Sequence, residues 1–167
     1  SFALFAAIFG LATTALQSKD KPAQHFQTSD RCFACHNNLY TATGQDVSIG
    51  LNWRTSMMAN AGRDPYWMAG VRREATDHPE SVKLIEDECT ICHMPMARYQ
   101  AHTEGREGTA FNHMPPVGDS PEDKLATDGV SCSLCHQITP EKLGTRESLV
   151  GRFVVDTSKP MGQKSVY

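Results

Sequence analysis

The stretch CTICH at residues 89–93 is the middle one of three copies of a single pattern, preceded by CFACH at 32–36 and followed by CSLCH at 132–136. All six cysteines of the 167-residue chain belong to these copies. In each copy two residues separate the cysteines, and a histidine directly follows the second one. Any interpretation of the chain therefore has to explain why two cysteines and a histidine recur together.

The spacing within each copy is that of a c-type haem attachment site. Side chains three positions apart lie on the same side of one helical turn, where two sulfurs can reach the two vinyl groups of one porphyrin while the adjacent histidine reaches its iron. The sequence thus predicts three covalently attached haem c groups. The expected thioether positions are Cys32, Cys35, Cys89, Cys92, Cys132 and Cys135, and the expected proximal iron ligands are His36, His93 and His136.

Other uses of paired cysteines explain the pattern less well. A structural zinc site needs four ligands, usually two cysteine pairs or a cysteine pair with a histidine pair, and six thiols in three pairs divide awkwardly into such sites. Disulfides, whether within a pair or between pairs, leave the three adjacent histidines without a role. Iron–sulfur clusters normally use a tighter run of cysteines. Covalent haem is therefore the favoured interpretation.

Composition indicates one domain built from short elements. The length, with 40% hydrophobic and 21% charged residues, fits a single domain. A net charge of −3 without any run of like charges gives no reason to expect a nucleic-acid partner. Twelve glycines and nine prolines favour turns over a large sheet. We expect a mostly α fold in which short helices and irregular loops wrap around three haems.

Helix start signals are short and well defined. Asp64 and Ser120 each precede a proline, which places an N-cap before a proline at the first helical position. Asp123 stands where the acid of a capping box belongs. Another helix is expected to begin at Pro79 and to lead into the second motif. The stretch GRFVVD at 151–156 is the one predicted strand.

The N-terminal segment differs from the rest of the chain. Residues 1–18 carry no charged side chain and are rich in Phe, Leu, Ile and Ala, which is typical of a signal-peptide core or of part of a membrane-spanning helix. Either interpretation places the remaining chain in the periplasm or another extracytoplasmic space. We expect a retained hydrophobic helix that anchors a trihaem domain at 19–167. The terminal KPMGQKSVY is compatible with a native chain that continues beyond residue 167.

The sixth iron ligands must come from outside the motifs, where four of the seven histidines lie. His102 and His113, between the second and third motifs, are the preferred distal ligands. Met114, in HMPPVG, competes with them because thioethers also ligate haem iron. Whether His25 and His78 also ligate iron is left open by the sequence. Spacing alone does not assign any of these side chains to a particular iron.

The segment NWRTSMMANAGRDPYW at 52–67 resembles the Trp-x-x-Ser-x-His-Ala helix of multihaem cytochromes related to tetrahaem cytochrome c and hydroxylamine-oxidoreductase-like proteins. ECTICHMP and DGVSCSLCHQI are similar to haem sites of the same group, so the resemblance spans roughly residues 30–140. In such relatives the histidine of that helix is commonly a distal ligand, and here Met58 replaces it. The resemblance implies that Met58 ligates iron and gives one haem a higher potential than a bis-histidine haem. In the simpler alternative Met57 and Met58 only fill space beside Trp53.

Electron transfer is the function that these features favour. With 167 residues shared among three haems, the macrocycles should be close neighbours, and iron ligated by protein on both faces exchanges electrons with little rearrangement. We expect a membrane-attached subunit of a larger electron-transfer complex, with redox proteins as partners and no catalytic residues. The alternative is a multihaem oxidoreductase acting on a small nitrogen compound at an open haem, with Arg98, Tyr99 and His102 near the substrate. A structural subunit is the third possibility.

Overall fold

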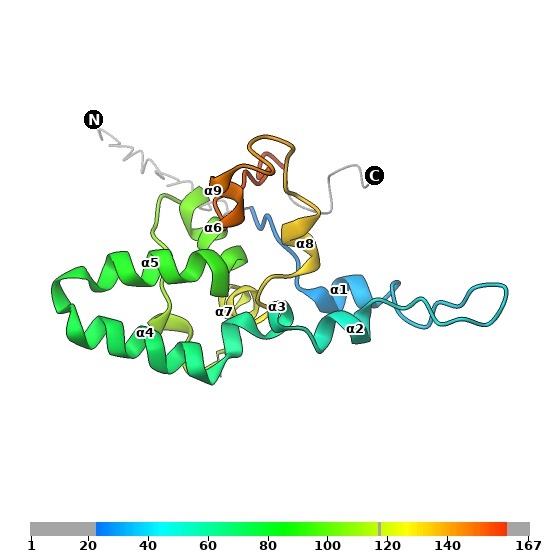
Figure 1. Ribbon diagram of the computed structural model, residues 1–167, viewed down its shortest axis with the longest axis horizontal. Helices are drawn as coiled ribbons and strands as arrows, with labels where there is room; N and C mark the ends of the chain where they lie inside the picture. Colours follow the sequence, from blue (N-terminus) through cyan, green and yellow to red (C-terminus); the bar gives the residue numbers. More distant parts are fainter. Residues whose placement is uncertain (1–22, 117, 160–167) are drawn as a thin grey trace, which may run out of the picture.

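The computed structural model describes residues 23–116 and 118–159, and in this part of the chain it is mostly helical, as predicted (Figure 1). The expected hydrophobic helix at 1–18 lies outside the described residues. Among the residues that are described, no helix has both the length and the apolar character needed to cross a membrane. The helices are α1 (Ser29–Phe33), α2 (Gly50–Arg54), α3 (Met57–Asn60), η1 (Ala61–Arg63), α4 (Pro65–Asp77), η2 (Pro79–Ser81), α5 (Val82–His93), α6 (Pro95–Thr103), η3 (Phe111–His113), α7 (Pro121–Thr127), α8 (Cys132–Cys135) and α9 (Arg146–Leu149).

The two longest helices, α4 and α5, lie antiparallel at one end of the molecule (Figure 1). Helix α4 begins as predicted, because the Asp64 side chain accepts a hydrogen bond of 2.9 Å from the Tyr66 backbone N–H and Pro65 follows at the first helical position. The short η2 turn then reverses the chain into α5. The hairpin brings the last turn of α5, which carries the second motif, beside the first turn of α4.

The centre of the fold is formed by α6 and α7, which pack against each other. Helix α7 has the predicted capping box, in which Ser120 and Asp123 each accept a hydrogen bond from the other's backbone N–H. Three of the eleven side chains in the buried core are alanines and three are methionines, so few large side chains anchor it. The core consists of Phe26, Trp67, Val71, Met94, Met96, Ala97, Ala110, Met114, Leu125, Ala126 and Leu134.

Helices α1, α2 and α8 lie at the other end of the molecule, with α8 directly beside α1 although about 100 residues separate them in sequence (Figure 1). An irregular loop, residues 34–49, projects from this end between α1 and α2. One isolated antiparallel bridge between Tyr40 and Asp46 closes the loop. The first and third motifs therefore share one end of the fold, while the second lies at the end of α5.

The prediction of a strand at 151–156 was wrong. The segment makes a single antiparallel bridge, between Ile138 and Val155, and no strand forms in the described part of the chain. The bridge has two hydrogen bonds of 2.9 Å, from the Thr139 N–H to the Val154 carbonyl and from the Asp156 N–H to the Gln137 carbonyl, and the pairing does not extend beyond them. On its other side the segment is held by a side chain, since the Phe153 carbonyl accepts a bond of 2.7 Å from the Tyr99 hydroxyl.

Candidate functional site

The second motif occupies the C-terminal turn of α5. Cys89 and Cys92 lie three residues apart within this helix, so both side chains emerge on one side of it. Cys89 is half-buried and Cys92 is exposed. Burial raises the pKa of the Cys89 thiol above its ordinary value. His93 ends the helix. The two cysteines and the histidine of the motif thus lie within one turn of the same helix, the local arrangement that a c-type attachment site uses.

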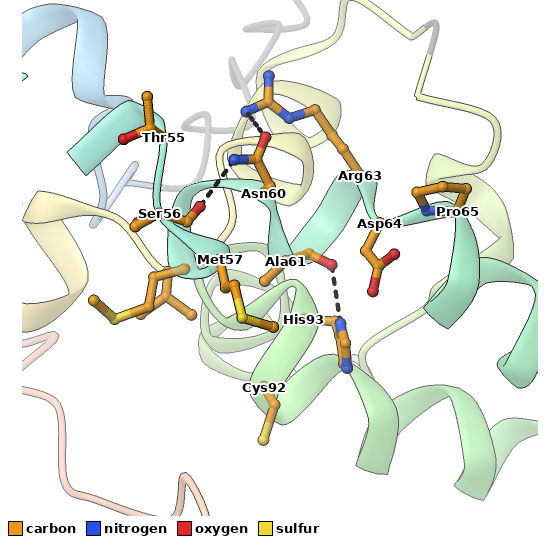
Figure 2. Close-up of a pocket in the computed structure, with 12 residues that line it drawn as sticks. Thr55, Ser56, Met57, Asn60, Ala61, Arg63, Asp64, Pro65, Cys92 and His93 are labelled. Atoms are coloured by element: carbon orange, nitrogen blue, oxygen red, sulfur yellow. Dashed lines mark hydrogen bonds between the residues drawn. The ribbon is translucent and has the colours of Figure 1, made fainter. Parts of the chain in front are cut away.

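His93 is held by contacts with two other elements. Its Nδ1 lies 2.9 Å from the Ala61 carbonyl of η1, and because a carbonyl only accepts, the imidazole N–H must donate there. The ring also stacks on Trp67 of α4, with 4.2 Å between centroids and 3° between planes. Figure 2 shows the other ring nitrogen on the far side from Ala61. In the neutral imidazole this arrangement selects the tautomer whose Nε2 has a free lone pair, the form in which a histidine ligates metal.

A cavity of about 580 Å³ lies next to His93 and Cys92 (Figure 2). Its size falls within the range of about 300–1,000 Å³ that is typical of ligand and cofactor sites. Met57 and Met58 contribute to its wall, with 89% and 52% of their surface exposed. The remaining lining residues are Thr55, Ser56, Asn60, Ala61, Arg63, Asp64, Pro65 and Val130. The structure therefore brings the predicted ligand Met58 to the same cavity as the predicted ligand His93.

The first and third motifs lie against each other. Gln27, just before α1, both donates a backbone N–H to the Ser133 hydroxyl (3.1 Å) and accepts that hydroxyl's proton at its carbonyl (2.6 Å). Ser29 donates its N–H and its hydroxyl to the Asp128 carboxylate at 2.8 and 2.7 Å. Burial raises the pKa of the Cys32 thiol to about 11, and the neighbouring Cys132 thiol acts in the same direction. Two of the candidate sites thus share a boundary.

His36 and His136, the other expected proximal ligands, are both exposed and follow α1 and α8 closely. Their backbone N–H groups donate to the carbonyls of Cys32 and Cys132, at 2.9 and 3.0 Å. Each pentapeptide therefore closes on itself as one helical turn, which keeps its histidine next to its two cysteines. The geometry at the first and third motifs matches the requirement for attachment in the same way as at the second.

The structure places His102 and His113 on carboxylates. His102 Nε2 lies 2.7 Å from Asp87 Oδ1, and His113 Nδ1 lies 2.7 Å from Asp123 Oδ1. His113 is only 7% exposed, whereas His102 is open to solvent. Neither contributes to the cavity beside His93. A carboxylate on one imidazole nitrogen is the usual way to orient the other nitrogen toward a metal. His113 has that arrangement at Nδ1, while its Nε2 lies 3.9 Å from Glu122 Oε1.

Asp87, which sequence reasoning missed, organises the surroundings of the second motif. Its carboxylate accepts hydrogen bonds from Arg98 (2.6 Å), His102 (2.7 Å) and the Gly108 backbone N–H (2.7 Å). Burial opposes ionisation, but these donors outweigh it and lower the pKa of Asp87 from 3.8 to about 2. The Arg98 guanidinium is therefore bound to a carboxylate of the protein itself. No signal at Asp87 itself could have revealed this role, because its partners come from α6 and the following loop.

The surroundings of the motifs fit an apolar macrocycle. Large exposed apolar side chains fall mainly in three places: the segment after the first motif, the cavity beside the second, and the segment after the third. Apolar side chains near each motif are available to contact a macrocycle. They are Leu39, Tyr40, Val47, Ile49 and Leu51; Met57 and Met58; and Leu143, Leu149 and Val150.

One histidine beside each cysteine pair is a donor set that a haem can use. Across the described residues, no group of three or more His, Cys, Asp or Glu side chains is arranged to hold a metal ion. In a haem the porphyrin supplies four of the iron's ligands, so the protein needs to offer only one on each face.

Comparison with known proteins identifies no relative, since no family model, curated protein or solved structure matches the chain.

Proposed function

We propose that this chain is a trihaem c-type cytochrome that relays electrons between closely spaced haems, as a membrane-attached subunit of a larger extracytoplasmic electron-transfer complex. One observation carries the proposal: three Cys-x-x-Cys-His pentapeptides account for every cysteine in the chain. The redox partners are other proteins or subunits of that complex. The proposed cofactors are three covalently attached haem c groups.

The protein's task in this proposal is to bind, orient and tune the cofactor, while the haem iron supplies the one-electron chemistry. His93 illustrates the orienting part. Its ring is clamped between the Ala61 carbonyl and the Trp67 indole, so it would hold a fixed plane relative to an attached porphyrin. The hydrogen bond to Ala61 makes the imidazole a stronger donor to iron, which favours the ferric state.

The close spacing of the three sites supports a relay. Cys32 and Cys132 are neighbours across the α1–α8 contact. Val130, two residues before Cys132, lines the cavity beside His93, and its backbone N–H donates to the Met58 carbonyl at 3.0 Å. The third motif therefore lies directly beside the first, and its flanking residue Val130 reaches the cavity of the second. Attached macrocycles would be near neighbours, as electron hopping requires.

The distal ligands that we propose are Met58, His102 and His113. Met58 is supported by its place in the wall of the cavity beside His93, and His113 by the carboxylate that holds its Nδ1. His102 would have to use Nδ1 or release Asp87. Ligands on both faces of each iron would leave no position for a substrate, which is the property that separates the relay from an oxidoreductase.

The test is to produce the chain in a host that attaches haem c and to measure its intact mass and its pyridine haemochrome spectrum. Three haems per chain are expected, and replacing both cysteines of one motif by serine should remove one haem each time. The oxidised protein should show only low-spin iron and should not bind cyanide or nitrite. An apoprotein, or zinc as the sole metal, would refute the assignment. High-spin iron that binds nitrite would favour the enzyme instead.

A further inference from the structure

A second and smaller cavity, of about 180 Å³, lies between α1, α2, η1 and α7. We call it the cationic pocket, because three basic side chains face it. It is too small for a macrocycle but sufficient for one carboxylate or a similar oxyanion, since cavities that hold whole cofactors start at about 300 Å³. Its lining residues are Thr28, Asp30, Arg54, Arg63, Lys124, Thr127 and Asp128.

The two acidic side chains of the cationic pocket are already engaged. Asp30 accepts a hydrogen bond of 2.7 Å from Arg54, which pairs one cation with one anion. Asp128 uses both carboxylate oxygens to bind Ser29. Lys124 forms an ion pair of 2.8 Å with Asp119, a residue outside the lining. Arg63 is therefore the one lining cation that no carboxylate of the described residues pairs with.

Arg63 has donors that the protein does not use. One terminal nitrogen donates to two neutral oxygens, the Ala59 carbonyl at 3.0 Å and the Asn60 amide at 3.2 Å. Its Nε is buried without an acceptor among the described residues, which also offer Arg63 no ion pair. A buried guanidinium N–H without a partner is costly, and a planar carboxylate matches the fork of Arg better than any other ligand.

Arg63 also connects the two cavities. It lines the larger cavity beside His93 as well as the cationic pocket. Figure 2 shows its guanidinium and Cys92 at opposite ends of the group of lining residues, with Asn60 and Ala61 between them. A porphyrin carries its two propionates on the edge opposite the vinyl groups that bond to cysteine. A cation at the end away from Cys92 is therefore suitably placed for a propionate.

We propose that the cationic pocket is a carboxylate-binding site, with Arg63 as the principal ligand and Lys124 as the second cation. The source that the connection between the cavities favours is a propionate of the haem on the second motif, and in this form the inference rests on the proposed function. A free oxyanion has the same chemistry and is the other source. In the propionate case Arg63 is a positioning residue that raises the reduction potential of one haem, because a nearby cation disfavours the ferric state.

The experiment uses the full, haem-loaded chain and three variants. Arg63→Gln removes the charge, Arg63→Lys keeps the charge but not the fork, and Arg73→Gln is the control, since Arg73 is an exposed residue that pairs with Asp77 on α4. Lys124→Gln, at a 54% exposed side chain, provides a second test that does not disturb a buried group. Spectroelectrochemical titration at several pH values gives the three potentials, and calorimetry with inorganic phosphate measures binding of a free oxyanion.

The propionate source predicts that Arg63→Gln lowers one of the three potentials. The pH range over which that potential changes should also shift to higher pH, because the propionate pKa rises without the guanidinium. Arg63→Lys should recover part of both changes, and Lys124→Gln should show a weaker version of each. The free-oxyanion source predicts phosphate binding that Arg63→Gln abolishes, with all potentials unchanged. If Arg63→Gln and Lys124→Gln both behave like Arg73→Gln in every measurement, the site does not exist. Haem counting by mass is independent of these outcomes, so failure of the trihaem assignment would be recognised separately.

Discussion

Gly62 is the position where a single added methyl group should disturb the second motif most directly. A Cβ at this residue would lie far inside contact distance of the Ala126 carbonyl oxygen of α7 and 3.1 Å from the His93 carbonyl oxygen of α5. Both neighbours are backbone atoms of helices, which cannot move aside as a flexible side chain would. Gly62→Ala must therefore push η1 away from α5 and α7 together.

The expected cost follows from the same contacts. Overpacking of this kind costs about 1–3 kcal/mol, whereas Gly→Ala at an unhindered helical position gains roughly 0.5–1 kcal/mol. A loss of about 2 kcal/mol lowers Tm by roughly 4–8 °C for a chain of this size. Gly70→Ala is the matched control, because this glycine lies within α4 and its Cβ would meet nothing within 4 Å. It should leave Tm unchanged or raise it slightly.

The displacement also has a specific spectroscopic consequence. Ala61, the residue before Gly62, accepts the hydrogen bond from His93 Nδ1. Moving η1 should lengthen that bond, weaken the imidazole as a donor and raise the potential of one haem, while the other two stay unchanged. Thermal melts followed by circular dichroism and a redox titration of Gly62→Ala and Gly70→Ala measure both effects. Equal Tm values and equal potentials for the two variants would refute the packing argument.

Two further sets of variants test the distal ligand and the electrostatics around Asp87. Met58→Leu should make one haem high-spin and able to bind cyanide, whereas Met57→Leu should not; the reverse result would transfer the role to Met57. Met58→His should keep that haem low-spin but lower its potential. Asp87→Asn should cost about 2 kcal/mol of stability at neutral pH, while Asp77→Asn, at an exposed pair on α4, should cost less than about 0.5 kcal/mol. Because folding lowers the pKa of Asp87 from 3.8 to about 2, its contribution is full above pH 3.8 and is lost as the pH falls through about 2. Acid unfolding of Asp87→Asn should therefore be less pH-dependent in this range, and parallel acid titrations of the two proteins would contradict the assignment.

The features that could be predicted from the sequence are those that depend on a few adjacent residues. The caps at Asp64 and Ser120 form as predicted, since the N-cap side chain and the N–H groups it accepts from are separated by only two or three positions. The helix predicted to begin at Pro79 starts there as the short 3-10 turn η2, and α5 continues from Val82 into the second motif. The strand at 151–156 failed because its partner segment pairs with it at a single bridge. Propensity within the segment contains no information about that partner.

The contacts that position the candidate site could not be predicted, because their partners come together only in the folded chain. Trp67 reaches His93 through the hairpin of α4 and α5. The Trp53 indole contacts the Phe33 ring, with 5.7 Å between centroids, and donates to the Val130 carbonyl at 3.2 Å, and neither partner could be predicted from the sequence. A sequence pattern identifies candidate cofactor-binding side chains, but tertiary packing determines which of them lie close together in the fold.

The order of the three sites in space differs from their order in sequence, and this has a consequence for the proposed relay. Cys132 lies beside Cys32, and Val130 lines the cavity beside His93, so the third motif stands between the first and the second. Loss of its haem should therefore interrupt transfer between the other two, whereas loss of the first or second haem leaves an adjacent pair. Replacing Cys132 and Cys135 by serine should slow equilibration between the remaining haems in flash photoreduction far more than the equivalent change in the first or second motif. Similar rates in all three variants would mean that the haems are not connected in this order.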